Sequence, residues 1–581
     1  MRRSRCGRPL FETHGTVHVE ELHFDSARVR QQGPVNHFGR FNWMGHNWAQ
    51  YSDARRDRLV RNIRVLLANT WFSGICGFEV ICFLLVWFLN THAHANLDWV
   101  PVLHACDSDR SRREVLCSMN ETARPKHIVR KCNDRLPKEL KDAIAEELPS
   151  RNDLLDAARY AYQRCRHKMM DHYKHSVPVL MTSPCDLHFC LRDRCLLTTA
   201  SGDPEGFFED IEFSAARPLT CSAAGLICVG VAQQGDQLGD ASPHIIHQYQ
   251  WCGERHVERE VFLFTECGEA NDAEHLANDL PAGYAHWTMC LDGPDVGDCV
   301  RRRRRYTASL DLSEAVVVEE LEDFDVVCGR HAVMSFEDFY CLPQKYWQCE
   351  LQHSLNTRVT PVSQAITFDD LLLPSQRTRI VDYDKLRRKK EQAGKVDPRE
   401  TWVYDLDHKV DGMPKAFHSR WFERAGRGVA VPMNTTVSHN TWWNTKLKRW
   451  MFAMEKGISQ CYPILPEWCE QMGMQEFPID FLALLRNQHL KPTTLSSMFG
   501  NGWHLASAGS LFMWFLSSIE LRSNLAKLSR PIACEISDDD EGSGQEKENC
   551  EPSANTVCND ATTWRKRVKP KITNEVIDLE P

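Results

Sequence analysis

The sequence has no apolar run long enough to cross a membrane. Its two candidates are Val80 to Leu89, which spans ten residues, and the shorter run from Leu511 to Leu516, whereas a membrane-spanning helix needs about 20 apolar residues. The basic residues near the N-terminus are not followed by an apolar stretch, so they lack the pattern of a secretory signal. We therefore expect a soluble protein without membrane contact, in which both runs form buried helices.

The chain also lacks a regular framework of cysteines. Its 24 cysteines are irregularly spaced over 581 residues, which favours free, mostly buried thiols in a reducing compartment over a disulfide scaffold. Cys185, Cys190 and Cys195 lie near His188, but their spacing is not that of a zinc finger or ribbon. We predict no metal site, and zinc binding by this group is the less favoured alternative.

An excess of negative charge is present, but it is confined to one segment. The net charge is −9, and the segment from Glu535 to Glu551 holds eight acids and one lysine, which amounts to −7. The rest of the chain is close to neutral, so its charge does not argue against an anionic partner.

The first clear pattern is a strand, a glycine turn, a helix and a second strand. Residues 69–77 have the pattern of a strand end and glycine turn, and residues 78–89 that of the helix that follows it. Residues 101–106 form a second short strand that ends at Asp107. This order is typical of the start of a nucleotide-binding α/β unit.

Further strands and helices alternate along the chain. Helical periodicity covers residues 137–175, and the strand candidates are residues 178–181, 225–231, 261–264 and 306–312. Such alternation predicts a mainly parallel sheet that helices cover on both faces.

These patterns divide the chain into five parts. We expect an unassigned N-terminal segment, a catalytic α/β domain with an insertion around residues 135–215, an irregular domain rich in tryptophan, a return to the catalytic domain, and a polar tail without fixed structure. Their respective bounds are residues 1–60, 61–312, 313–490, 491–528 and 529–581.

Cys228 is the candidate nucleophile. It lies in a small, apolar, strand-like segment that opens into a glycine-rich loop, and a buried inert thiol is the alternative for any single cysteine in this chain. Glu266 ends the next strong strand, so its carboxylate should emerge at the same carboxyl edge of the sheet, where open α/β sheets bind ligands.

Five consecutive arginines, Arg301 to Arg305, lead into the strand-like segment at residues 306–312. Such a run is more often a solvated patch or a basic targeting signal. If the strand begins within the run, alternate arginines share one face. Arg302 and Arg304 would then point together at a phosphate or at an active-site carboxylate.

Taken in order, these segments resemble the motifs of the cytosine-C5 DNA methyltransferases. The family has a Phe-x-Gly-x-Gly-Gly loop, an acid after the second strand, a Pro-Cys loop, a Glu-Asn-Val strand end, a Gln-x-Arg-x-Arg strand and, after a target-recognition domain, a Gly-Asn turn. This chain has FSGICGFE at 72–79, HACDSD at 104–109, GLICVGVAQQG at 225–235, FTEC at 264–267, GDCVRRRRRY at 297–306 and FGNGWHLASAG at 499–509. LPEWCEQMGM at 465–474 also resembles the segment that precedes the last motif.

The resemblance implies a Rossmann-like fold that uses S-adenosylmethionine, together with an irregular target-recognition domain. It implies that Cys228 attacks C6 of a flipped-out cytosine, that Glu266 holds the base, and that Arg302 and Arg304 orient this region and the DNA backbone. The cofactor residues that it implies are Phe72, Ser73, Gly74, Gly77, Asp107 and Asn501.

The implied recognition domain has a basic and aromatic segment. Residues 377–427 hold 14 Lys and Arg against nine Asp and Glu, a composition that suits contact with phosphates and a groove. The expected partner is double-stranded DNA with its target base flipped out, and the expected location is the nucleus. The basic WRKRVKPK at 564–571 is either a nuclear signal or a solvated stretch.

Several motif positions depart from the family pattern. Cys76 replaces the middle glycine, Ile227 replaces the proline before the nucleophile, Cys267 follows Glu266 in place of asparagine, and Val300 stands for the glutamine. Two alternatives therefore stay open: a catalytically inactive relative that binds DNA or partners, and a methyltransferase that acts on transfer RNA. Pro184-Cys185 is a literal Pro-Cys pair, but it lacks the glycine-rich loop and lies 81 residues before Glu266.

Overall fold

The computed structural model describes a large part of the chain. The described residues are 17–25, 27–29, 39–72, 74–129, 136–149, 154–175, 218–226, 238, 241–269, 271–298, 300–330, 336–356, 367–395, 398–407, 410, 416–418, 441–487 and 489–528. Within them, none of the helices combines the length and the apolar character that a membrane crossing requires.

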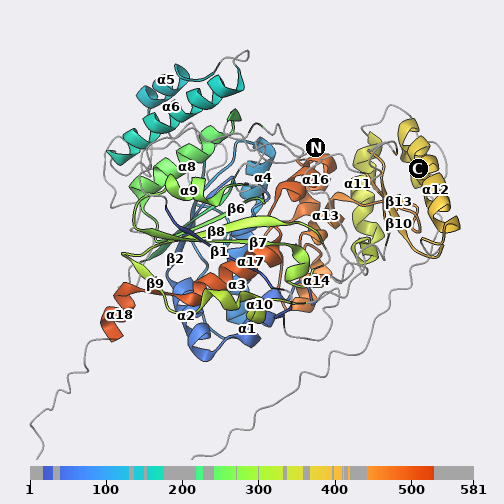
Figure 1. The fold of residues 1–581 in the computed structure, drawn as a ribbon. Helices are drawn as coiled ribbons and strands as arrows, with labels where there is room; N and C mark the ends of the chain where they lie inside the picture. Colours follow the sequence, from blue (N-terminus) through green and yellow to red (C-terminus); the bar gives the residue numbers. More distant parts are fainter. Residues whose placement is uncertain are drawn as a thin grey trace, which may run out of the picture.

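The centre of the molecule is an open sheet of eight strands (Figure 1). Among these strands, β8 runs antiparallel to both of its neighbours and the other pairs are parallel. In spatial order they are β1 (Val19–Leu22), β7 (Tyr284–Leu291), β8 (Arg304–Asp311), β6 (Phe262–Gly268), β5 (Leu219–Gly225), β2 (Leu66–Trp71), β3 (Val102–Cys106) and β4 (His127–Val129).

Helices cover both faces of this sheet, as the alternating pattern predicts (Figure 1). One face packs into the larger apolar core with α1 (Trp43–Gln50), α2 (Asp53–Arg64), α3 (Gly77–His92), α4 (Arg110–Ser118) and α17 (Leu505–Ser518). The other face carries α5 (Lys138–Ala145), α6 (Leu155–Lys174), α8 (Ile245–Glu258) and α9 (Ala273–Asn278).

Two helices explain the apolar runs in the sequence. All residues of α3 from Gly77 to Leu89 are buried, and so are all 14 residues of α17. A helix that is apolar all round must lie inside the protein. Both runs therefore form core helices, as their length predicts.

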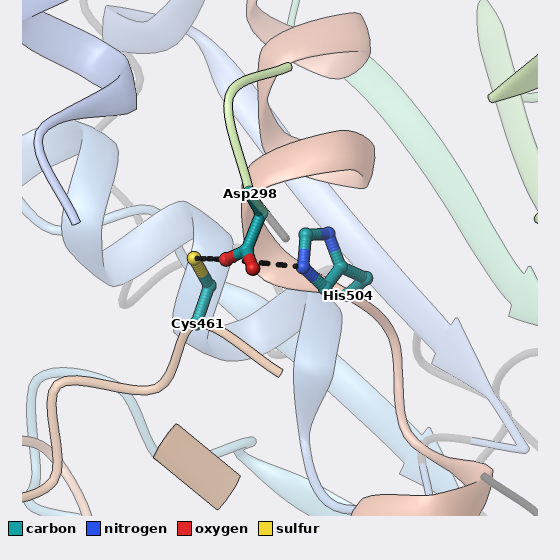
Figure 2. Close-up of side chains that lie close together, drawn as sticks. All are labelled: Asp298, Cys461 and His504. Atoms are coloured by element: carbon teal, nitrogen blue, oxygen red, sulfur yellow. Dashed lines mark hydrogen bonds and ion pairs between the residues drawn. The ribbon is translucent and has the colours of Figure 1, made fainter. Parts of the chain in front are cut away.

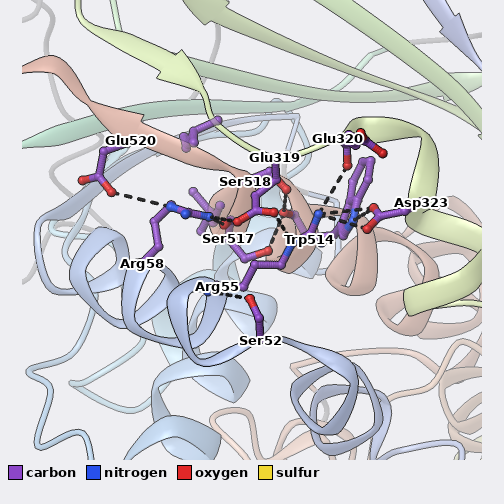
Figure 3. A network of polar contacts seen from close by, with 12 residues as sticks. Ser52, Arg55, Arg58, Glu319, Glu320, Asp323, Trp514, Ser517, Ser518 and Glu520 are labelled. Atoms are coloured by element: carbon purple, nitrogen blue, oxygen red, sulfur yellow. Dashed lines mark hydrogen bonds and ion pairs between the residues drawn. The ribbon is translucent and has the colours of Figure 1, made fainter. Parts of the chain in front are cut away.

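The N-terminal and C-terminal parts of the described chain pack against each other. Helix α2 contacts α17, and Arg58 of α2 donates to the Ser517 carbonyl at 2.6 Å and pairs with Glu319 at 2.9 Å (Figure 3). Arg55 pairs with Asp323 at 3.2 Å in the same network. Helices α1 and α2, which include most of residues 43–60, therefore contribute to the larger core, although this part of the sequence carried no clear periodicity.

A second, smaller sheet lies between residues 402 and 450. It contains β10 (Trp402–Asp405), β11 (Ala416–His418), β12 (Trp442–Asn444) and β13 (Arg449–Trp450), all antiparallel. Helix α12 (Pro374–Gln392) packs its Tyr383 ring on the Tyr404 ring of this sheet, with centroids 5.0 Å apart. A small separate core here consists of Leu372, Tyr383, Trp402, Tyr404, Leu406 and Trp443.

The remaining elements belong to neither of these two sheets. Strand β9 (Ala315–Val317) pairs with β14 (Ile519–Leu521). The helices are α10 (Phe324–Val327), α11 (Gln344–Asn356), α13 (Ala453–Ser459), α14 (Pro466–Met472), α15 (Phe481–Arg486), α16 (Pro492–Asn501) and α18 (Arg522–Leu528). The 3-10 turns are η4 (Gly293–Asp295), η5 (Leu321–Asp323), η6 (Phe336–Phe339) and η7 (Phe368–Leu371).

Two expected elements differ from the structure. The strand predicted at residues 225–231 occupies residues 219–225, because Gly225 ends the ladder with β6 instead of beginning it. The Gly-Asn pair at 500–501, expected as a turn, forms the last residues of α16. The predicted strand at 178–181, the possible zinc group at 185–195 and the tail from residue 529 lie outside the described residues.

Candidate active site

The turn between β2 and α3 keeps a glycine-like backbone. Phe72, Gly74 and Cys76 all have left-handed backbones, with φ of 55°, 60° and 62°. This conformation is easy for glycine and costly for other residues. Cys76 therefore adopts a backbone that suits glycine, and burial raises the pKa of its thiol well above the ordinary value.

Asp107 lies directly after β3 and faces this turn. Its carboxylate accepts hydrogen bonds from the Gly74 N–H at 3.1 Å and the Asp109 N–H at 2.9 Å, and it pairs with Arg112 at 3.4 Å. Burial raises the pKa of Asp107, and these three donors oppose that shift. The acid predicted from the sequence therefore lies beside the glycine turn, at the carboxyl edge of the sheet.

Glu266 is held by arginines from the neighbouring strand. Its Oε1 lies 2.9 Å from Arg304 Nε and 3.9 Å from Arg302 Nη2, and its side chain is only 7% exposed. The two arginines share a face because they are two residues apart on an extended chain. The structure thus brings together the carboxylate and both of the arginines that the sequence singled out.

Arg302 has a second set of contacts that the sequence did not indicate. Its Nη1 donates to the Gly500 carbonyl at 2.8 Å, and its Nη2 donates to the Gly502 carbonyl. These carbonyls belong to the end of α16 and the residue that follows it. Arg302 therefore fastens the C-terminal motif to the arginine strand.

Cys228 itself lies outside the described residues, as does Ser73. The chain that leads to Cys228 is described as far as Leu226, whose N–H donates to the Glu266 carbonyl at 2.8 Å. Gly225 is the residue of β5 that pairs with Glu266. The nucleophile candidate therefore follows two residues after a point fixed beside Glu266.

Asn501, the last residue of α16, lies next to the glycine turn between β2 and α3. Its carbonyl oxygen is 3.9 Å from the place where a Cβ on Gly74 would lie, and its side chain is exposed. A Cβ on Gly502 would lie 2.5 Å from the Ile75 side chain, and one on Gly77 would lie 2.9 Å from the Trp503 side chain, so the two glycine-containing turns pack closely against each other. Glycine at 502 and at 77 is required by this close approach.

Trp503 is the residue at this edge that the sequence analysis missed. Its indole is 4% exposed and packs edge-on against Phe78 of α3 and Phe264 of β6, each with ring centroids 5.7 Å away. A tryptophan beside a Gly-Asn pair is not distinctive in a chain with 17 tryptophans. The signal that could have indicated Trp503 is its place in the C-terminal motif, because that motif lies against the first glycine turn.

A buried polar cluster lies just behind this edge (Figure 2). Asp298, Cys461 and His504 form the group among the described residues whose ligand atoms are close enough to suit a metal. However, Arg40 Nε lies 3.3 Å from Asp298 Oδ2 and brings a positive charge. The Cys461 thiol lies 3.0 Å from Asp298, and burial raises its pKa, so it stays protonated.

The orientation of His504 agrees with an ion-pair cluster and not with a metal site. Its Nδ1 accepts the Ser507 N–H at 3.3 Å as the cap of α17. A neutral ring therefore carries its proton on Nε2, which faces Asp298 at 3.5 Å. Cys461 and His504 thus each point a polar hydrogen at Asp298, and Arg40 provides a positive charge.

We predict that Asp298→Asn destabilises the protein by about 3–5 kcal/mol, because it leaves the buried Arg40 charge without its partner. Burial alone would raise the pKa of Asp298, but Arg40 and the hydrogen bonds from His504 and Cys461 hold it well below 3.8. The stabilisation is thus present above about pH 4 and is lost as the pH falls further.

Urea denaturation of both proteins at pH 7 and at decreasing pH measures this difference. Asp53→Asn is a matched control, since it breaks an ion pair with Arg56 in which the Asp53 side chain is 94% exposed, and it should cost less than about 1 kcal/mol. Equal stability of Asp298→Asn and wild type at pH 7 would contradict the assignment.

No family model matches the chain, and no curated protein matches its sequence. Solved structures similar to it include a Spodoptera frugiperda DNMT2 mutant, at 10% identity over 78% of this chain and 99% of that one, with a TM-score of 0.33. The S. pombe Dnmt2 methyltransferase is 12% identical over 78% and 98% (TM-score 0.34), and a putative DNA modification methyltransferase of an E. coli prophage is 10% identical over 75% and 98% (TM-score 0.30).

These TM-scores are low, so the fold is identified from the topology of the sheet and the residues at its edge. The doubly wound sheet, with a glycine turn after β2, an acid after β3 and β8 inserted antiparallel, is a Rossmann-like methyltransferase fold.

Proposed function

We propose that the chain is a methyltransferase that transfers a methyl group from S-adenosylmethionine to C5 of cytosine in DNA. The observation that carries this proposal is the Glu266 carboxylate, buried and paired with Arg304 at 2.9 Å. It lies level with the end of β5, from which the chain runs into Cys228. This position supports the proposal, because the described chain passes beside Glu266 at Leu226, two residues before Cys228.

The residues of this edge suit the chemistry of cytosine methylation. The Cys228 thiolate would add to C6 of the base, and the new S–C6 bond makes C5 a carbon nucleophile. Glu266 would accept a hydrogen bond from the exocyclic amine and deliver a proton to N3, which stabilises the ring as negative charge develops. After methylation, loss of the C5 proton and release of the thiolate would regenerate Cys228.

The residues around the glycine turn suit the adenosine part of S-adenosylmethionine, which when bound supplies an electrophilic methyl group. The Asp107 carboxylate would accept the ribose hydroxyls, and the half-buried Phe72 ring would lie against the adenine. Ser73, Gly74 and Gly77 would line the cofactor at the turn, and Asn501 would close the site from the C-terminal side. The donor set of this turn therefore fits the cofactor.

DNA is the proposed nucleic acid because of the long region between β8 and α16. Helix α12 within it carries seven lysines and arginines, from Arg377 to Lys390, and such side chains contact phosphates. This region would hold the duplex while the target base is flipped out. Action on DNA in turn implies a nuclear location in a cell with a nucleus.

A covalent trap tests the proposal. Duplex DNA with 5-fluorocytosine should form a complex with the full chain that survives denaturation, provided that S-adenosylmethionine is present, because the fluorine cannot leave C5. Calorimetry with S-adenosylhomocysteine checks the cofactor separately. If neither trapping nor cofactor binding is observed, the catalytic proposal fails and the inactive relative is supported. Trapping with a fluorocytosine transfer RNA, but not with DNA, would change the substrate class.

A further inference from the structure

Trp503 lies at the switch point of the large sheet, where the order in which the chain adds strands reverses. From β2 the chain adds β3 and β4 on one side, while β5 and β6 lie on the other. In open α/β sheets the crevice at this switch point, outside the carboxyl ends of the strands, receives the ligand. In this protein the switch point lies between Phe72, after β2, and Gly225, the last residue of β5.

The indole of Trp503 reaches this crevice. A Cβ on Gly225 would lie 3.0 Å from Trp503 Nε1 and 3.2 Å from the Phe72 carbonyl oxygen, so both atoms border the same point. At its other end, the Trp503 Cβ is 2.9 Å from where a Cβ on Gly77 would lie. The side chain therefore spans from the first residue of α3 to the end of β5.

Trp503 lies on one of the two sides of this switch point, the side of β5. Asp107 lies at the end of β3, on the far side of β2 from β5, and it marks the ribose end. The segment with Cys228 follows β5, so the methyl group has to arrive on the β5 side. Trp503 stands on that side, against the last residue of β5.

We propose that Trp503 closes the methyl-donor end of the crevice, so that the methionine part of S-adenosylmethionine binds only when the indole is displaced. The inference rests on the proposed function and adds a residue that controls cofactor affinity. Adenosine, which lacks the methionine part, should bind without moving the indole.

The backbone around Trp503 is fixed on both sides, so the displacement is a side-chain movement. Arg302 holds the carbonyls of Gly500 and Gly502, and Asp298 faces the His504 ring at 3.5 Å. The turn from residue 500 to 504 is thus clamped to the segment that precedes β8. A rotation of the indole would leave these contacts in place.

Calorimetry with two ligands tests this inference on the full chain. Trp503→Ala should bind S-adenosylhomocysteine about tenfold more tightly than wild type, which corresponds to about 1.4 kcal/mol. Its affinity for adenosine should change less than twofold. Trp503→Leu is a second variant that keeps apolar packing in case the alanine variant is unstable, and it should show the same selective gain.

Phe512→Leu is the matched control. Phe512 of α17 is fully buried and packs on Phe78 and Phe264, the same rings that Trp503 contacts. Its shortening loosens the same core behind the crevice, so it should leave the affinities for both ligands unchanged. A gain in this control equal to that of Trp503→Ala would show that core loosening, and not the indole, limits binding.

Two further outcomes overturn the inference. If Trp503→Ala weakens the binding of S-adenosylhomocysteine or leaves it unchanged, Trp503 is a wall of the site and not its closure, and the proposed function stands. If it strengthens adenosine binding equally, the indole lies at the wrong end. If folded wild type and variants bind neither ligand, the proposed cofactor itself is wrong.

Discussion

Replacing Cys228 with serine is expected to reduce methyl transfer to cytosine by about 10⁴-fold or more. A hydroxyl is a far weaker nucleophile than a thiolate, and the reaction cannot begin without the bond to C6. The loss should appear in kcat, since the cofactor residues are on other segments. The measurement is incorporation of labelled methyl groups into a cytosine-containing duplex, with the fluorocytosine trap as a second readout.

The prediction separates Cys228 from the many other thiols of the chain. Cys290→Ser is a suitable control, because this half-buried thiol lies on β7 and its pKa is raised mainly by burial, which makes it a poor nucleophile. It should trap DNA as wild type does. A Cys228→Ser protein that still methylates would remove Cys228 from the mechanism, even if the enzyme is active.

Glu266→Gln is expected to lower kcat by about 10²–10³-fold, the usual effect of removing one preorganised electrostatic contact to the reacting group. Glutamine has the same shape, but it loses the charge that pairs with Arg304 at 2.9 Å. Its amide can still hydrogen-bond to N3 and the exocyclic amine of cytosine, but it cannot deliver a proton to N3 as negative charge develops on the ring. S-adenosylhomocysteine affinity should change little.

Glu269→Gln supplies the comparison. Glu269 follows the same strand and pairs with Arg303 at 2.9 Å, but its side chain is 54% exposed, so screening by water makes the pair weak. This variant should keep full activity. If both variants lose activity equally, what matters is the overall charge balance around the arginine strand and not the Glu266 contact. If neither variant loses activity, Glu266 has no role in the reaction.

The local patterns predicted the core of the fold well. The apolar run at 80–89 becomes α3, and the short strands before and after it become β2 and β3, because a fully buried strand or helix has to be apolar along its length. The alternation of strands and helices gave the parallel, two-sided sheet, which the structure confirms. The boundaries of β5 were wrong, since residues before Gly225 looked no more strand-like than those after it.

The pairing of Glu266 with Arg304 was also predictable. Glu266 was expected to end its strand and lies two residues before the end of β6, Arg304 begins β8, and alternation places Arg302 and Arg304 on the same face. The antiparallel insertion of β8 beside β6 was not predictable from either segment. It depends on the register between them, in which Glu266 pairs with Tyr306.

Other features had no local signal at all. The cluster around Asp298 joins Arg40, Cys461 and His504 from three distant segments, each unremarkable by itself. The contact of Arg302 with Gly500 and Gly502 spans about 200 residues of sequence. Trp503 acquires its significance only because α16 ends against the first glycine turn.

The sequence alone therefore determined the kinds of element and the order of the candidate motifs, since apolar periodicity and glycine or acid punctuation are properties of neighbouring residues. Only the tertiary structure decided which strand ends meet, which carbonyls Arg302 holds and which side chain stands at the switch point. Those depend on close packing between segments that are far apart in the chain, and packing is settled by shape and register over the whole core.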